Sequence, residues 1–120
     1  MQLVCLDQGQ VIVKKLLLAQ GFSERFWGLM GTRELDPQAG LLLTPCSAIH
    51  TWFMRFPLDV VFLDREWKIV KIVEKLPPFQ AALGGIKARM ALELPGGRAR
   101  EAKLVLGQQL ALLKKSNNYL

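Results

Sequence analysis

Glycine and proline interrupt this sequence so often that the apolar segments between them are short. Ten glycines and six prolines occur in 120 residues. These two residue types are the strongest interruptions of regular structure, and short aliphatic and β-branched segments between them are typical of strands. The sequence therefore predicts a mostly β chain that carries one or two short helices.

The clearest strands are predicted over residues 58–63 and 67–73, which a hairpin loop at 64–66 joins. The segment 58–63 presents apolar side chains on both of its alternating faces, so we expect a central strand that is covered on both sides. Further strands are predicted over residues 3–6, 11–18, 41–43 and 109–113.

Residues 89–94 are also predicted to form a strand, with a different pattern. The apolar residues of this segment share one face, whereas Arg89 and Glu93 lie on the other. Such alternation is typical of a strand with one buried face and one solvated face. The pattern therefore predicts a polar face that carries Arg89 and Glu93.

A short helix is predicted near the start of the chain. Ser23 is a suitable N-cap, and Phe26, Leu29 and Met30 follow at the spacing of one helical face. Gly31 can end this helix. The remaining predictions are a second short helix over 98–105, extended chain over 52–55, and loops over 36–40 and 77–85.

Length and composition indicate a single domain. The chain has 120 residues, of which 51% are hydrophobic, and this is enough for one core. No repeat, linker or low-complexity segment divides the sequence. We therefore predict one domain over residues 1–120, with its core over about 2–113 and a frayed tail at 116–120, in a monomer or weak dimer.

The charge and the cysteines restrict the partners and the compartment. The formal net charge is +6, but the basic residues are scattered rather than gathered in a run, which is typical of a solvated surface and argues against nucleic acid as a partner. The sequence shows neither a secretory signal nor an apolar stretch of the ~20 residues that span a bilayer. With only Cys5 and Cys46, both expected to be reduced, we predict a cytoplasmic protein.

Four motifs, in order along the chain, resemble those of one family. They are Arg-Phe-Trp-Gly-Leu-Met-Gly-Thr-Arg at 25–33, Gly-Leu-Leu-Leu at 40–43, a stretch at 52–64 that contains Pro-Leu-Asp-Val-Val-Phe-Leu-Asp, and Leu-Glu-Leu-Pro-Gly-Gly at 92–97. With a late glycine at Gly107, the chain resembles the bacterial and archaeal family called domain of unknown function 192 from about residue 16 to residue 112. This resemblance implies a compact barrel-like β-sandwich with one short helix near its start. It implies no activity.

Two departures from the family pattern concern polar groups. Members usually have a longer polar link between the basic residue and the proline, whereas here Phe56 alone separates Arg55 from Pro57. An aspartate usually follows the late glycine, and here Gln108 takes its place. A role of those polar groups in a site common to the family does not carry over to this chain.

The segment 45–51 gathers the residues best suited to covalent chemistry. It contains a thiol, two hydroxyls and the only histidine of the chain. Cys46 and His50 could act as nucleophile and base. However, residues four apart in a strand lie ~13 Å apart, which is too far for proton transfer unless a tight turn joins them. The other interpretation is a small buried cysteine and a histidine bonded to backbone.

Neither a metal nor a cofactor is predicted. Structural zinc takes four nitrogen or sulfur ligands, and catalytic zinc takes three protein ligands. The soft ligands here are only Cys5, Cys46 and His50. The glycines match neither the dinucleotide-binding nor the Walker pattern.

Asp59 is the most informative charge, because it lies on a strand that is otherwise apolar. An unpaired buried carboxylate is costly, so Asp59 should find a cation and hydrogen-bond donors. The candidate cations are Arg25, Arg33 and Arg55. Asp59 is then either a structural ion pair or turn anchor, or the floor of a pocket in which it and an arginine contact a ligand.

Three hypotheses of function follow from these residues. The one we favour is a non-catalytic module that binds a small ligand or a partner in a cleft around residues 46–59. The residues assigned to ligand binding are Thr51, Trp52, Arg55, Asp59, Arg25 and Arg33. The alternatives are a small thiol-dependent or acid–base enzyme that uses Cys46 and His50, and a basic adaptor for nucleic acid or an acidic partner.

Overall fold

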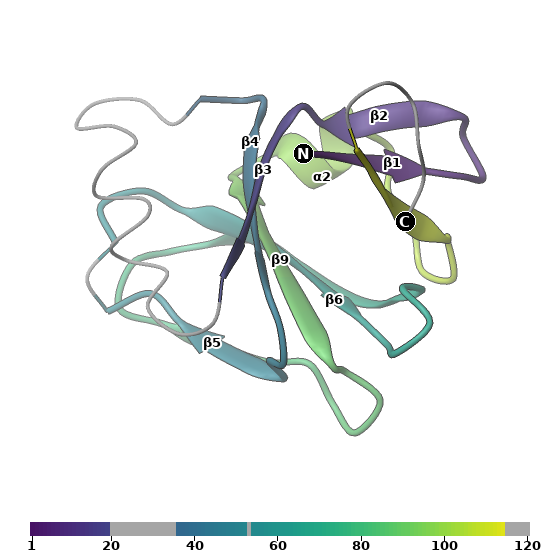
Figure 1. Cartoon of the computed structure of the whole chain (residues 1–120). Helices are drawn as coiled ribbons and strands as arrows, with labels where there is room; N and C mark the ends of the chain where they lie inside the picture. The colour runs from purple at the N-terminus through teal and green to yellow at the C-terminus, as the bar shows by residue number, and fades with distance from the viewer. Residues whose placement is uncertain (20–35, 53, 115–120) are drawn as a thin grey trace.

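A five-stranded sheet forms the centre of the computed structural model, which describes residues 1–19, 36–52 and 54–114 (Figure 1). Its strand order is β3-β4-β9-β6-β7. The bounds are β3 Lys15–Ala19, β4 Ala39–Leu43, β9 Met90–Pro95, β6 Leu58–Leu63 and β7 Ile69–Leu76. β3 pairs with β4 in parallel, and the other neighbours are antiparallel.

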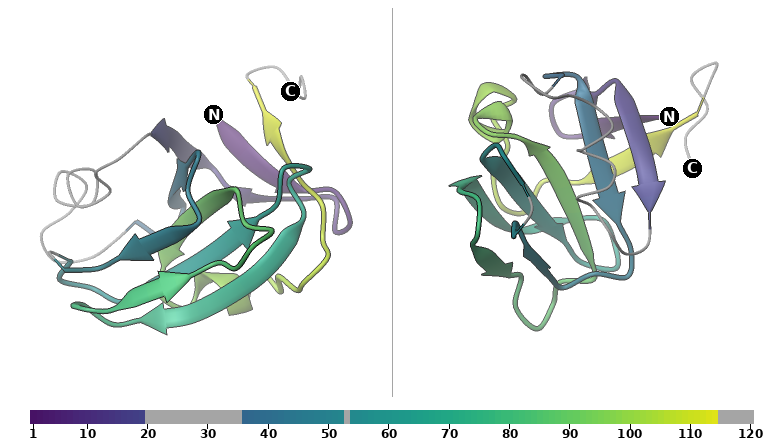
Figure 2. Two further views of the ribbon diagram at one scale, coloured as in Figure 1. Left: turned by 90° about the horizontal axis from the view of Figure 1, so that it is seen from below. Right: turned by 90° about the vertical axis from the view of Figure 1, so that its left-hand side faces the viewer.

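Two smaller sheets accompany the central one. Strands β10, β1 and β2 form a three-stranded antiparallel sheet, and β5 pairs with β8 in a two-stranded one. Figure 2 shows the three-stranded sheet beside one end of the central sheet. The bounds are β1 Gln2–Cys5, β2 Gln10–Val13, β10 Leu110–Leu113, β5 Ala48–His50 and β8 Ala81–Leu83, and the helix α2 is Arg98–Glu101.

The core consists of two clusters, one on each face of the central sheet. Alternate residues of one strand join different clusters: Val61 and Leu63 of β6 pack with the three-stranded sheet and α2. Val60 and Phe62 pack with residues of β5 and β8. The period-2 alternation of a strand therefore divides its apolar side chains between two cores.

The predicted fold class is confirmed, with one refinement of its geometry. The described chain is mostly strand with one short helix, and its sheets pack as in a sandwich. The central sheet is not a closed barrel, because its end strands β3 and β7 are not paired with each other. The prediction of a covered central strand is confirmed as well, since every residue of β6 is buried.

One predicted strand is divided in the structure. The single strand predicted over 11–18 is two strands, β2 and β3, which belong to different sheets. Lys14 bends the chain between them, and the amides of Lys14 and Lys15 both donate to the carbonyl oxygen of Gln38. Two adjacent lysines favour exposure, so the chain passes from one sheet to the other at this point.

Other differences arise from long-range pairing. The loop predicted over 77–85 contains β8, which the pairing with β5 creates. Residues 52–55 were predicted to be extended, but a turn begins there, with the Met54 amide donating to the carbonyl oxygen of Thr51 at 3.1 Å. The helix predicted after Ser23 and the tail at 116–120 lie outside the described residues.

The polar face predicted for residues 89–94 is wrong for Glu93. All residues of β9 are buried, and Glu93 is 0% exposed. Glu93 pairs in register with Leu41 on one side and Val60 on the other, so it shares the face of the second cluster. Its strand lies between two others and is covered on both faces, which alternation within one strand does not reveal.

Candidate binding surface

Asp59 is an acceptor for three backbone amides from separate elements. Its Oδ1 accepts from the amides of Lys75 and Gly97 at 2.8 and 3.0 Å, and its Oδ2 accepts from the Ala99 amide at 2.7 Å. The carboxyl group is 0% exposed. Asp59 thus joins the end of β7 and the first turn of α2 to the central strand, as a turn anchor.

The cation expected at Asp59 is not found among the described residues. No described lysine or arginine forms an ion pair with this carboxylate, and its hydrogen bonds go to backbone amides instead. Arg55 is exposed, and Arg25 and Arg33 lie outside the described residues. Charge-assisted bonds to amides can stabilise a buried carboxylate without a cation, so we assign Asp59 a structural role.

Thr51 holds the loop that precedes β8. Its Oγ1 donates to the carbonyl oxygen of Pro77 at 2.6 Å and accepts from the Gln80 amide at 2.9 Å. Its backbone amide donates to the carbonyl oxygen of Gln80 at 2.8 Å, and its carbonyl oxygen accepts from the Phe79 amide at 2.9 Å. The side chain is 0% exposed, so Thr51 positions this loop and has no free group for a ligand.

Three rings lie beside this buried threonine, at His50, Trp52 and Phe79, and we call them the ring row. The ring centroids of His50 and Trp52 are 6.5 Å apart, and those of Trp52 and Phe79 are 6.2 Å apart in an edge-to-face arrangement. Trp52 is 51% exposed and Phe79 is 63% exposed. Because Thr51 is bonded on both sides of the loop, it fixes where Trp52 and Phe79 meet.

Phe79 has a backbone conformation that bulky residues rarely adopt. Its φ is 63°, in the left-handed region, where a non-glycine residue is uncommon and a bulky one is an outlier. The hydrogen bonds from residues 79 and 80 to Thr51 hold this conformation. Hydrogen bonds to Thr51 thus hold Phe79 in a strained backbone conformation in which its ring is exposed to solvent.

The sequence predicted only part of the ring row. Trp52 and His50 were candidates, but Phe79 was assigned to a loop and given no role. A lone aromatic residue after two prolines was the only signal in the sequence. The contact across 27 positions depends on the β5–β8 pairing, which local patterns do not specify.

Cys46 and His50 do not interact in the structure. The Cys46 Sγ donates to the carbonyl oxygen of Ala48 at 3.1 Å, whereas the His50 ring contacts Trp52. Cys46 is partly buried against the second cluster, and His50 is exposed on β5. The described arrangement therefore does not bring the His50 ring to the Cys46 thiol as a base.

The environment of Cys46 favours the protonated thiol. Burial raises the pKa of Cys46, and the negative charge of Glu93 raises it further. The thiolate is the nucleophile in cysteine chemistry. The structure therefore places Cys46 where its reactivity is low.

We expect Cys46 to react slowly with iodoacetamide. At pH 7 its alkylation should be at least about fivefold slower than that of cysteine in an unstructured peptide, because little thiolate is present. Mass spectrometry distinguishes Cys46 from the buried Cys5. His50→Ala should leave the rate unchanged. Rapid alkylation below pH 7 that is lost in His50→Ala would instead support the thiol enzyme.

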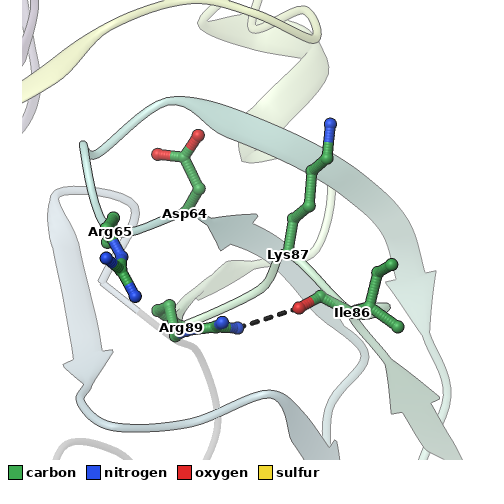
Figure 3. A pocket seen from close by; sticks show the side chains of 5 residues that line it. All are labelled: Asp64, Arg65, Ile86, Lys87 and Arg89. Carbon is green, nitrogen blue, oxygen red and sulfur yellow. Dashed lines mark hydrogen bonds between the residues drawn. The ribbon is translucent and has the colours of Figure 1, made fainter.

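Two shallow pockets lie near residues 45–47 and at the adjoining β6–β7 turn. One of about 260 Å³ is lined by Pro45, Cys46, Ser47, Ala88 and Arg89. The other, of about 350 Å³, is lined by Asp64, Arg65, Ile86, Lys87 and Arg89 (Figure 3). Neither of these two pockets contains Thr51, Trp52, Arg55 or Asp59, so the cleft predicted around residues 46–59 stays a prediction.

Neither a metal-binding cluster nor a membrane-spanning helix occurs within the described ranges. No group of three or more His, Cys, Asp or Glu side chains there could hold a metal ion. No helix in the same part of the chain is long and apolar enough to cross a membrane. Both cysteines are free thiols.

Fold and site together define a class: a small β-sandwich domain with exposed aromatic rings in contact on its surface. The family model of domain of unknown function 192, described as Uncharacterized ACR, matches residues 4–112. The chain belongs to this family, as its motifs indicated.

Solved structures share the fold. A protein of unknown function from Novosphingobium aromaticivorans DSM 12444 is 21% identical, with a TM-score of 0.74 over 92% of this chain and 83% of that one. A Sinorhizobium meliloti 1021 protein described as a "putative transcription regulator" is 23% identical, with a TM-score of 0.71 over 91% of this chain and 88% of that one. No curated protein matches the sequence.

Proposed function

We propose that this domain is a non-catalytic binding module that captures a protein partner through the ring row. The observation that carries the proposal is the pair of exposed rings at Trp52 and Phe79, in contact at 6.2 Å. Aromatic side chains are enriched at the centres of protein interfaces, where they contribute much of the binding energy. The buried Thr51 fixes the loop that carries Phe79, so less ordering is needed on binding.

The open shape of this surface favours a protein partner over a small ligand. Small-molecule sites enclose most of the ligand surface. The rings of Trp52 and Phe79 are more than half exposed, so neither is enclosed as in such a site. A peptide segment that lays apolar side chains between the rings fits this geometry.

Charge favours an acidic segment. The chain carries a net charge of +6, and the exposed Arg55 lies three positions from Trp52 without an ion pair among the described residues. Complementary charge speeds association and selects partners. Two free thiols support the expectation of a cytoplasmic setting.

Single-stranded nucleic acid is a second candidate for the same rings. Bases stack on aromatic side chains in basic grooves, and the description of the Sinorhizobium neighbour concerns transcription. The angles between ring planes, 54° and 72°, weigh against it because each ring blocks part of its neighbour's face. Mixed-sequence oligonucleotides, measured by fluorescence anisotropy at two salt concentrations, test this candidate.

The test of the main proposal is peptide selection. Random dodecapeptides displayed on phage are selected on the wild-type domain and counter-selected on Trp52→Ala/Phe79→Ala. We expect peptides that combine acidic residues with apolar anchors, and an affinity that falls at least about tenfold in the double variant, since each ring supplies interface area.

The control is the exposed apolar pair Val105 and Leu106, which are 56% and 64% exposed. Val105→Ala/Leu106→Ala should bind the selected peptides like the wild type. Peptides that bind all three proteins equally, or a selection that enriches nothing, would contradict the proposal.

A further inference from the structure

We propose that the pocket between the β6–β7 turn and the turn after β8 binds a small divalent oxyanion of the phosphate type. The residues that carry this inference are Arg65 and Arg89, and Lys87 lines the same pocket with its amino group directed away from these two guanidinium groups (Figure 3). The site is separate from the ring row, and the inference does not depend on the proposed function.

Two turns bring the three cations to one pocket. Arg65 lies in the hairpin turn that closes with the Trp67 amide donating to the carbonyl oxygen of Asp64 at 3.0 Å. Lys87 lies in the turn in which the Ala88 amide donates to the carbonyl oxygen of Gly85 at 3.2 Å. The Arg89 amide donates to the carbonyl oxygen of Leu63 at 2.8 Å and joins the two.

Arg89 is held in place before any ligand arrives. Its Nη1 donates to the carbonyl oxygens of Ile86 and Ala88 at 2.9 and 3.0 Å. No described partner takes its Nη2 or Nε. A guanidinium fixed by backbone can donate a further pair of hydrogen bonds to an oxyanion with little loss of side-chain freedom.

The positive charge of this pocket is not neutralised by ion pairs. The four ion pairs among the described residues involve other cations, at Lys15, Lys68, Arg98 and Arg100. Asp64 also lines the pocket, but its Oδ1 accepts from the Glu66 and Lys68 amides. Figure 3 shows its carboxylate pointing away from Arg65 and Arg89, while Arg65 reaches toward Arg89.

The charge and size of the pocket indicate the ligand class. Three cations and one carboxylate leave a net charge of +2 on the lining side chains, which a divalent anion balances. Two guanidinium groups match the several oxygens of a phosphate group better than the two of a carboxylate. The volume of about 350 Å³ accommodates a group of this size.

The experiment titrates the intact 15N-labelled domain with inorganic phosphate at pH 7.5, with sodium chloride balancing the ionic strength. We expect saturable amide shifts confined to residues 64–66 and 86–89, with a millimolar dissociation constant. Acetate should bind at least about threefold more weakly, because it carries one charge. Arg65→Gln/Arg89→Gln should weaken phosphate binding about tenfold or more.

The matched control is Lys14→Gln/Lys114→Gln, which removes the same net charge from exposed residues outside the pocket. It should bind phosphate like the wild type. Arg65→Gln alone provides a variant that cannot disturb folding through a lost bond, since Arg65 has no described partner. Equal weakening in the control, shifts spread over the whole surface, or no shifts up to 50 mM phosphate would overturn the inference.

Discussion

Asp59→Ala should destabilise the domain by about 3–5 kcal/mol, because it leaves three backbone amides without their acceptor and each buried unsatisfied donor costs about 1–3 kcal/mol. These amides belong to Lys75, Gly97 and Ala99. Urea unfolding measures the change, and the Tm should fall by more than about 10 °C. Asp59→Asn should lose less, since one oxygen acceptor remains.

Asp64→Ala is the matched control for this prediction. Asp64 also accepts from two amides, those of Glu66 and Lys68, but in an exposed turn where water can replace the acceptor. We expect a loss of about 1 kcal/mol there. If Asp59→Ala cost no more than Asp64→Ala, the carboxylate would not hold β7 and α2 to the central sheet.

Gly84→Ala should destabilise the domain by about 2–3 kcal/mol through overpacking. A Cβ at this position would lie 2.5 Å from the Cβ of Ala88 and 2.5 Å from Cδ1 of Phe62. Phe62 is 0% exposed and lies in the second core cluster, so its ring can yield to the added Cβ only by displacing other core side chains. The measurement is again urea unfolding, combined with near-ultraviolet circular dichroism of the core.

The neighbouring Leu83→Ala provides the comparison. Leu83 is 67% exposed, and its truncation should change the free energy of unfolding by less than about 0.5 kcal/mol. A Gly84→Ala variant as stable as Leu83→Ala would show that the loop after β8 is not packed on Phe62 as described.

The parts of the fold that local patterns specify were predictable. The strand over 58–63 carries apolar residues on both faces, which predicted its central position, and the structure places it between β9 and β7. A short helix was predicted over 98–105, and α2 does begin at Arg98 but ends at Glu101, earlier than predicted. Pairings between distant segments were not predictable. A short segment such as β8 becomes a strand only because it pairs with another strand, and its own residues do not specify that partner.

The candidate site shows the same limit. The segment 46–59 was predicted to gather its polar groups at one place. Its described side chains instead point in different directions. Thr51 and Asp59 face inward and bond to backbone, whereas Trp52 and Arg55 face solvent. The type of a residue told us that Asp59 needs donors. It could not tell us that amides of three elements supply them.

The cations around Arg89 were missed for a related reason. Alternation predicted Arg89 on the polar face of a strand, whereas Arg89 is exposed and immediately precedes β9. Arg65 and Lys87 lie in turns 22 positions apart. Their common pocket exists because β6 and β9 are neighbours in register. Without knowledge of the strand pairing, the sequence does not indicate that these three residues line one pocket.

The stability of Trp52→Ala/Phe79→Ala tests the central claim most directly, namely that the ring row serves binding rather than folding. Urea unfolding should show a loss below about 1.5 kcal/mol, the size of one aromatic contact between exposed rings. A loss above about 3 kcal/mol, as for truncation of buried aromatic side chains, would show that these rings belong to the core and would contradict the account.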